Sequence, residues 1–238
     1  MTQPIIVFDL DGTLVDTAPD LIAALSFCLA ESGLPEIDPK LFRAYLGMGG
    51  RAMIDRAFRQ ANRALDPKEH ERLIATFLKH YTDNIPGQSQ PFPGVLDAMQ
   101  RFSDAGWKLA ICTNKFQALS HALIDGLGLN ARFAANCGAD TFQWRKPDPR
   151  HLLSTIEQAG GDRHHAIMVG DSKTDIDTAK AAGIPVVAVD FGYTDQPVAS
   201  YEPSLVISSY DDLTIEVAER LIKAANGAES AVSIASLT

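Results

Sequence analysis

Short runs of consecutive apolar residues recur along the chain, separated by stretches with helical periodicity. An apolar run without polar alternation is typical of a strand covered on both faces of a parallel sheet. Five runs predict strands, at residues 5–8, 108–112, 166–169, 185–189 and 205–207. Four intervening stretches predict helices, at residues 95–105, 118–127, 149–159 and 174–182. This alternation predicts an α/β fold with a doubly wound parallel sheet.

Residues 16–86 interrupt the alternation directly after the first strand and predict helices without any convincing strand. Asp66 followed by Pro67 is a typical helix start, and Thr17 is the predicted N-cap of the first helix, with Asp20 three residues later. The sequence thus predicts a Rossmann-like α/β core with an inserted all-helical cap domain. The expected parts are a core at 1–15 and 87–226, a cap at 16–86 and a weakly structured tail at 227–238.

The charge balance argues against nucleic acid as a partner. The chain has 30 acidic and 21 basic residues, a formal net charge of −9. General binding to nucleic acid needs a basic face, so we expect no nucleic-acid partner. The apolar run at residues 5–8 is far shorter than the ~18 residues of a membrane span, and the three cysteines show no disulfide or zinc pattern. We therefore expect a cytoplasmic protein without a membrane partner; its oligomeric state is not predicted.

Polar side chains follow three of the predicted strands. They lie at residues 9–13, 113–115 and 170–175, and ligands of open parallel sheets bind at the carboxyl ends of the strands. Asp9 and Asp11 are two residues apart, so an extended chain would present both carboxylates on one face. Converging carboxylates repel one another unless a cation joins them. Because oxygen ligands are abundant here, Mg²⁺ is the predicted cofactor.

Four motifs in order resemble those of the haloacid dehalogenase superfamily of phosphatases. They are Asp-Leu-Asp-Gly-Thr at 9–13, Thr113, Lys146 in Arg-Lys-Pro-Asp-Pro at 145–149, and Gly-Asp-Ser-Lys-Thr-Asp at 170–175. The resemblance covers the chain up to the tail, and the helical insertion is similar to the superfamily's type-one cap. It implies a Mg²⁺-dependent phosphatase that acts on a small anionic phosphomonoester through an aspartyl-phosphate.

The resemblance also implies a role for each motif residue. Asp9 would be the nucleophile, and Asp11 would be the general acid and base. Thr113 and the backbone amide of Asn114 would bind phosphoryl oxygens, and Lys146 would neutralise both the nucleophile and the phosphate. The implied metal ligands are Asp9, the backbone carbonyl of Asp11, and Asp171, with Asp175 as a further ligand or as a residue that orients the ligands.

The segment Gly-Met-Gly-Gly-Arg at 47–51 lies in the cap between two helical stretches. One interpretation is an interhelical turn with Arg51 on the surface. The other follows from the resemblance, in which this segment is the substrate-specificity loop and Arg51 binds a carboxylate of the substrate.

The overall motif pattern resembles superfamily members that hydrolyse 2-phosphoglycolate. Four alternatives remain open at this point. They are a phosphatase for a sugar phosphate or pyrophosphate, a phosphomutase that returns the phosphate to a sugar, a metal-independent dehalogenase, and a binding protein that has lost catalysis.

Overall fold

A computed structural model of the chain describes residues 3–235, with side chains described over 3–227. Its α/β part contains one six-stranded sheet, and all neighbouring strands are parallel. The strands are β1 (Gln3–Phe8), β4 (Lys108–Cys112), β5 (Ala135–Cys137), β6 (Gly161–Gly170), β7 (Val186–Val189) and β8 (Leu205–Ile207). Their order is β5-β4-β1-β6-β7-β8, so β1 lies between β4 and β6. The predicted fold class is confirmed.

Helices cover both faces of this sheet. The core helices are α5 (Val95–Asp104), α6 (Gln117–Gly126), α7 (Pro149–Gln158), α8 (Lys173–Ala182) and α9 (Ile215–Ala235). Three short 3-10 helices join them, η2 (Asn130–Arg132), η3 (Val198–Tyr201) and η4 (Tyr210–Asp212). Buried residues of α5, α6 and α9 form one apolar cluster with the sheet, and those of α7 and α8 form a second.

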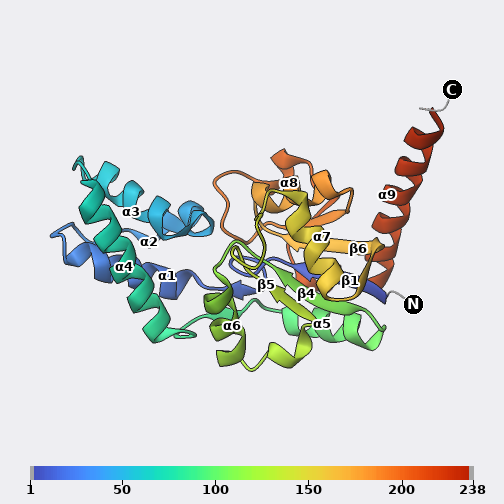
Figure 1. Cartoon of the computed structure of the whole chain (residues 1–238), viewed down its shortest axis with the longest axis horizontal. Coiled ribbons are helices and arrows are strands. Elements are labelled where there is room, and N and C mark those ends of the chain that lie inside the picture. The colour runs from blue at the N-terminus through green and yellow to red at the C-terminus, as the bar shows by residue number, and fades with distance from the viewer. Residues whose placement is uncertain (1–2, 236–238) are drawn as a thin grey trace.

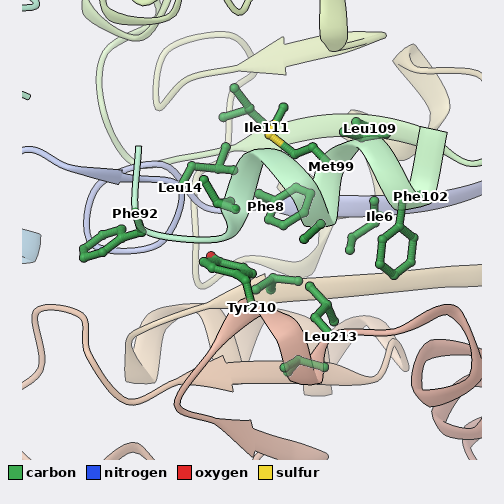
Figure 2. Close-up of a cluster of buried hydrophobic side chains, with 14 of the residues drawn as sticks. Ile6, Phe8, Leu14, Phe92, Met99, Phe102, Leu109, Ile111, Tyr210 and Leu213 are labelled. Atoms are coloured by element: carbon green, nitrogen blue, oxygen red, sulfur yellow. The ribbon is translucent and has the colours of Figure 1, made fainter. Parts of the chain in front are cut away.

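Strand β1 belongs to both clusters because its side chains alternate between the faces. Ile6 and Phe8 pack in the first cluster, and Ile5 and Val7 pack in the second. Figure 2 shows Ile6 and Phe8 close to side chains of α5 and β4, with Tyr210 and Leu213 approaching from the other side. These four residues of β1 are fully buried, which explains why the sequence shows an unbroken apolar run.

The cap is a separate helical lobe at one end of the molecule, and α9 extends from the opposite end of the core (Figure 1). The helices of the cap are α1 (Ala18–Ala30), α2 (Pro39–Phe42), η1 (Arg43–Met48), α3 (Gly49–Gln60) and α4 (Pro67–Asn84). It has an apolar cluster of its own, in which Leu25, Phe58 and Leu73 are buried. Helix α4 starts as predicted, because the Asp66 carboxylate accepts a hydrogen bond from the Lys68 backbone amide at 2.8 Å.

Two chain crossings join the cap to the core, and they are tied together. The short strands β2 (Val15–Asp16) and β3 (Gln90–Pro91) pair antiparallel, which the sequence did not predict. At the start of α1, the buried Asp20 carboxylate accepts hydrogen bonds from the backbone amides of Gln88 and Ser89 at 2.8 and 2.9 Å. The two crossings therefore form one joint rather than two independent linkers.

Three local features differ from what the sequence predicted. The three-residue strand β5 was missed, since its central Asn136 breaks the apolar pattern. Thr17 does not cap α1 with its side chain; its hydroxyl donates to Asp11 Oδ1 at 2.7 Å. Helix α9 continues to Ala235 through the stretch predicted as a weak tail, because its alanines favour a helix despite Gly227, while residues 236–238 lie outside the described part.

Among the helices of the described chain, none combines the length and the apolar character that crossing a membrane requires. The cytoplasmic location stays a prediction.

Candidate active site

A pocket of about 450 Å³ lies at the carboxyl ends of β1, β4 and β6, where both domains contribute to its lining. The core contributes Asp9, Asp11, Thr113, Lys146 and Asp171. The cap contributes the glycine-rich segment 47–50 and two aromatic side chains of α4, Phe77 and Tyr81. The predicted location at the strand ends follows from the parallel sheet, in which these ends share one edge.

One side of the pocket is a buried ion pair around Asp9, which directly follows β1. Lys146 Nζ lies 2.7 Å from Asp9 Oδ1 and 2.6 Å from Asp175 Oδ1. The Lys146 side chain is only 2% exposed. Burial lowers the pKa of Lys146, but the carboxylates of Asp175 and Asp9 raise it more, so the pKa lies above its usual value and the amine is charged. We call the residues Asp9, Lys146, Asp171 and Asp175 the nucleophile side, after the role that the resemblance implies for Asp9.

The nucleophile side holds more negative than positive charge. Asp9, Asp171 and Asp175 each offer one ligand oxygen, and these atoms lie within 4.8 Å of one another. With Lys146 as their cation, three carboxylates leave a net charge of −2 when all are ionised. Burial raises the pKa of Asp9 to about 6, because the lowering by Lys146 does not offset it. The pKa of Asp171 is raised well above its usual value by burial and by the carboxylate of Asp175.

Asp171 is held from two directions. Its Oδ2 accepts a hydrogen bond from the Tyr193 backbone amide at 2.5 Å, and its Oδ1 accepts one from the Thr13 hydroxyl at 3.2 Å. Gly12 allows the backbone of the first motif to lie close to the Asp171 carboxylate. Its φ is +84°, and a Cβ there would lie 2.4 Å from Asp171 Oδ2. Asp175, in the first turn of α8, accepts from the Ser172 backbone amide at 3.1 Å.

Asp11 lines the same pocket but belongs to a different set of contacts. Its carboxylate accepts from the Thr17 hydroxyl at 2.7 Å, and Lys115 Nζ lies 2.9 and 3.2 Å from its two oxygens. The same Nζ donates to the Tyr81 hydroxyl at 2.8 Å and lies 4.5 Å from the centre of the Tyr81 ring. We call Asp11, Thr17, Lys115 and Tyr81 the leaving-group side, after the role that the resemblance implies for Asp11.

Sequence reasoning assigned no role to Lys115 or Tyr81. The position of Lys115, two residues after Thr113 at a strand end, is the signal that could have drawn attention to it. Tyr81 lay within the apolar stripe of α4 and was indistinguishable from a cap core residue. Its stacking on Phe77, with ring centroids 6.3 Å apart, does place it in the cap cluster, while its hydroxyl reaches the core lysine.

The second motif connects these two sides. Thr113 is buried in the pocket wall, and its hydroxyl accepts a hydrogen bond from the Lys115 backbone amide at 3.1 Å. The Asn114 side chain donates to the Lys146 carbonyl at 2.9 Å, which fixes the loop that carries the third motif. Thr113, Asn114 and Lys146 thus lie together as the sequence predicted.

Arg51 is the one predicted site residue that the structure places elsewhere. It lies in the first turn of α3, and its guanidinium pairs with the Glu71 carboxylate of α4 at 2.7 and 3.0 Å. The Arg51 side chain is 57% exposed, and it is not part of the pocket lining formed by residues 3–227. This arrangement agrees with the surface position that the sequence left open for Arg51, and its contact with a substrate stays a prediction. The neighbouring segment 47–50 does line the pocket.

Known proteins resemble this chain over nearly its whole length. The chain is 64% identical over 225 residues to a phosphoglycolate phosphatase of Mesorhizobium japonicum, covering 94% of this chain and 99% of the relative. It is 44% identical to a phosphoglycolate phosphatase of Agrobacterium fabrum, covering 92% and 94% of the two chains. A crystal structure from Haemophilus somnus, described as a predicted phosphoglycolate phosphatase, superposes with a TM-score of 0.82 at 28% identity and covers 90% of this chain and 97% of that one.

The family model of the haloacid dehalogenase-like hydrolases matches residues 6–189. That match spans the first strand, the cap and all four motifs of the pocket. Motifs, fold and relatives therefore agree, and the chain is an enzyme that belongs to the haloacid dehalogenase-like hydrolase family.

Proposed function

We propose that this enzyme is a Mg²⁺-dependent phosphatase that hydrolyses 2-phosphoglycolate through an aspartyl-phosphate on Asp9. The observation that carries the proposal is the arrangement of the nucleophile side, where a buried carboxylate at a strand end contacts a buried lysine and lies within 4.8 Å of two further carboxylates in a pocket. The names of the relatives support 2-phosphoglycolate as the substrate.

The donor set of the nucleophile side fits a magnesium ion. Its ligand atoms are carboxylate oxygens, which hard divalent cations prefer. A charge of +2 would balance the net charge of the three carboxylates and Lys146, and it would lower the raised pKa of Asp9 and Asp171. Asp9, Asp171 and the Asp11 carbonyl would hold the ion, with Asp175 as a further ligand or as the residue that orients them. Bound there, Mg²⁺ would neutralise charge on the transferring phosphoryl group.

The chemistry then divides between the two aspartates of the first motif. A carboxylate oxygen of Asp9 attacks phosphorus, and the bond between phosphorus and the ester oxygen breaks. The electron pair stays on the ester oxygen, which takes a proton from Asp11. In the second half, Asp11 accepts a proton from water while that water attacks phosphorus, which releases phosphate and restores the Asp9 carboxylate.

Other residues of the pocket bind the phosphoryl group. The Thr113 hydroxyl and the Asn114 backbone amide are donors at the end of β4, and Lys146 is a fixed cation in contact with the nucleophile. Phosphoryl transfer spreads charge over the equatorial oxygens, so fixed donors and cations at these points stabilise the transition state. Because Lys146 is already held by two carboxylates, it needs no rearrangement to act.

A phosphate-release assay tests the proposal. Purified enzyme with Mg²⁺ is given 2-phosphoglycolate, a hexose phosphate, pyrophosphate and an aryl phosphate, each with and without a chelator. We expect the highest kcat/KM for 2-phosphoglycolate, stoichiometric glycolate and phosphate, and loss of activity in chelator. A higher kcat/KM for another phosphomonoester would change the substrate assignment but would leave the proposed phosphatase mechanism unchanged. Phosphate retained on a sugar isomer would indicate a mutase, and activity that survives the chelator would contradict the metal dependence.

A further inference from the structure

Lys115 is a buried cation on the leaving-group side of the pocket. Its side chain is only 6% exposed, yet it lines the pocket directly next to Asp11. Its Nζ lies 2.9 Å from Asp11 Oδ1, so the lysine ammonium is paired with a carboxylate. This places a cation next to the residue that, in the proposed function, protonates the leaving oxygen.

The other cations of the pocket are placed differently. Lys146 contacts Asp9 and Asp175, so it belongs to the nucleophile and the phosphate. Arg145 lines the same pocket but is an exposed residue. Among the lining residues, Lys115 is the buried cation next to the general acid. A buried charge next to a substrate site is strongly felt because little water screens it.

We propose that Lys115 determines substrate specificity by binding the carboxylate of the leaving group, an inference that rests on the proposed function. In 2-phosphoglycolate, one methylene carbon separates the carboxylate from the ester oxygen. Asp11 must reach that ester oxygen to donate its proton, and Lys115 Nζ lies 2.9 Å from Asp11 Oδ1. A cation in contact with the general acid is therefore placed for the carboxylate that lies one carbon beyond the ester oxygen.

Binding of this carboxylate also changes the contacts of Asp11. Without substrate, Lys115 directs its protons to both Asp11 oxygens and to the Tyr81 hydroxyl. A substrate carboxylate that takes over Lys115 releases Asp11 from this ion pair. Asp11 can then approach the leaving oxygen and donate the proton that it took from water in the preceding cycle, while Lys115 keeps its own protons throughout. A substrate without a carboxylate leaves the ion pair intact. Lys115 therefore favours substrates with a carboxylate in two ways, by binding that group and by releasing Asp11.

The test compares two substrates that differ in the carboxylate alone. These are 2-phosphoglycolate and 2-hydroxyethyl phosphate, in which a hydroxymethyl group replaces the carboxylate. The key variant is Lys115→Met, which keeps the length of the side chain and removes the charge; Lys115→Arg keeps the charge. Arg145→Met tests the other candidate cation, and Lys79→Met, an exposed lysine paired with Asp83 on α4, is the matched control.

We expect Lys115→Met to lower kcat/KM for 2-phosphoglycolate about ten- to a hundredfold more than for 2-hydroxyethyl phosphate. Lys115→Arg should keep part of the preference, and Arg145→Met and Lys79→Met should change both substrates equally. Equal losses on both substrates in Lys115→Met would show that the lysine acts only through Asp11, and this would overturn the proposal. A selective loss in Arg145→Met would overturn it as well.

Product inhibition provides a second measurement that does not require hydrolysis of 2-phosphoglycolate. Glycolate should inhibit aryl phosphate hydrolysis competitively in the wild type, with an inhibition constant at least about tenfold higher in Lys115→Met or in Lys115→Gln if the first variant does not fold. An unchanged constant contradicts the proposal. A wild type that hydrolyses both matched substrates equally well refutes carboxylate recognition but leaves the phosphatase intact, whereas a wild type inactive on every phosphomonoester refutes the proposed function itself.

Discussion

The two sides of the pocket differ in the origin of their residues. The nucleophile side is made entirely from core residues, in the loops that follow β1, β5 and β6 and in the first turn of α8, and its lysine is fixed between two carboxylates. The leaving-group side joins a core aspartate and a core lysine to Tyr81 of the cap. If the proposals above hold, Asp11 serves every substrate, and substrate choice depends on Lys115 and Tyr81, where the two domains meet. Changes on the nucleophile side should then affect all substrates, and changes at Lys115 and Tyr81 should affect them unequally.

The largest expected effect is loss of turnover in Asp9→Asn. The amide has nearly the same shape as the carboxylate but cannot attack phosphorus, so every phosphomonoester should be affected alike. The measurement is phosphate release by variant protein whose mass excludes deamidation. Asp125→Asn, on the exposed surface of α6, should remain fully active. Retained activity on any substrate would remove Asp9 from its role and would break the distinction between the two sides.

The same substitution should change how the stability of the metal-free protein depends on pH. A rise in the pKa of Asp9 from 3.8 to about 6 means that the folded state holds the proton more tightly than the unfolded chain. Wild-type stability therefore loses about 3 kcal/mol from this group as pH rises from about 4 to about 6, and the non-titrating asparagine does not. Urea unfolding of both proteins in chelator at pH 4 and pH 7 measures this. A stability difference that is the same at both pH values would contradict the assignment.

Asp171→Asn tests the metal site with a smaller effect. Removing one charged oxygen from the cluster should raise the Mg²⁺ concentration for half-maximal activity at least about tenfold, equally for both matched substrates. The control is Asp177→Asn on the same helix as Asp175, where the native side chain forms an exposed ion pair with Lys173. An unchanged Mg²⁺ requirement would show that the ion binds elsewhere.

Tyr81→Phe gives the smallest expected effect and probes the contribution of the cap. The ring that faces Lys115 Nζ remains, and only the hydroxyl contact at 2.8 Å is lost. A single neutral hydrogen bond corresponds to a loss of about two- to tenfold in kcat/KM, and we expect this loss for 2-phosphoglycolate rather than for 2-hydroxyethyl phosphate. Tyr45→Phe, another cap tyrosine outside the described pocket lining, is the control. Equal losses on both substrates would assign Tyr81 to the chemistry instead.

The sequence predicted the core because its signals are local. An unbroken apolar run at β1 reports burial on two faces, and the polar residues directly after it report the strand end. Asp9, Asp171 and Asp175 converge because parallel strands bring their carboxyl ends to one edge. Strand β5 escaped prediction because three residues around Asn136 give too short a pattern.

The leaving-group side could not be predicted in the same way because its contacts cross between domains. Lys115 and Tyr81 are 34 positions apart, and nothing in either segment shows that α4 packs over the end of β4. For Arg51, the sequence left a surface position and a substrate contact open, and its partner Glu71, on another helix, is visible only in the fold. Residue type therefore predicted which side chains line the pocket where a strand end fixed their position, but not where helix packing did.

The most direct test of the central claim is to trap phosphate on Asp9. In Asp11→Asn, an aryl phosphate with a good leaving group can still phosphorylate the nucleophile, because that departure needs little help from an acid, while water attack lacks its base. The protein is mixed with this substrate and Mg²⁺, quenched in acid and digested, and the peptides are analysed by mass spectrometry. The account predicts hydroxylamine-sensitive phosphate on the peptide that carries Asp9, in an amount matching the burst of released phenol. A burst of phenol without phosphate on that peptide would contradict it.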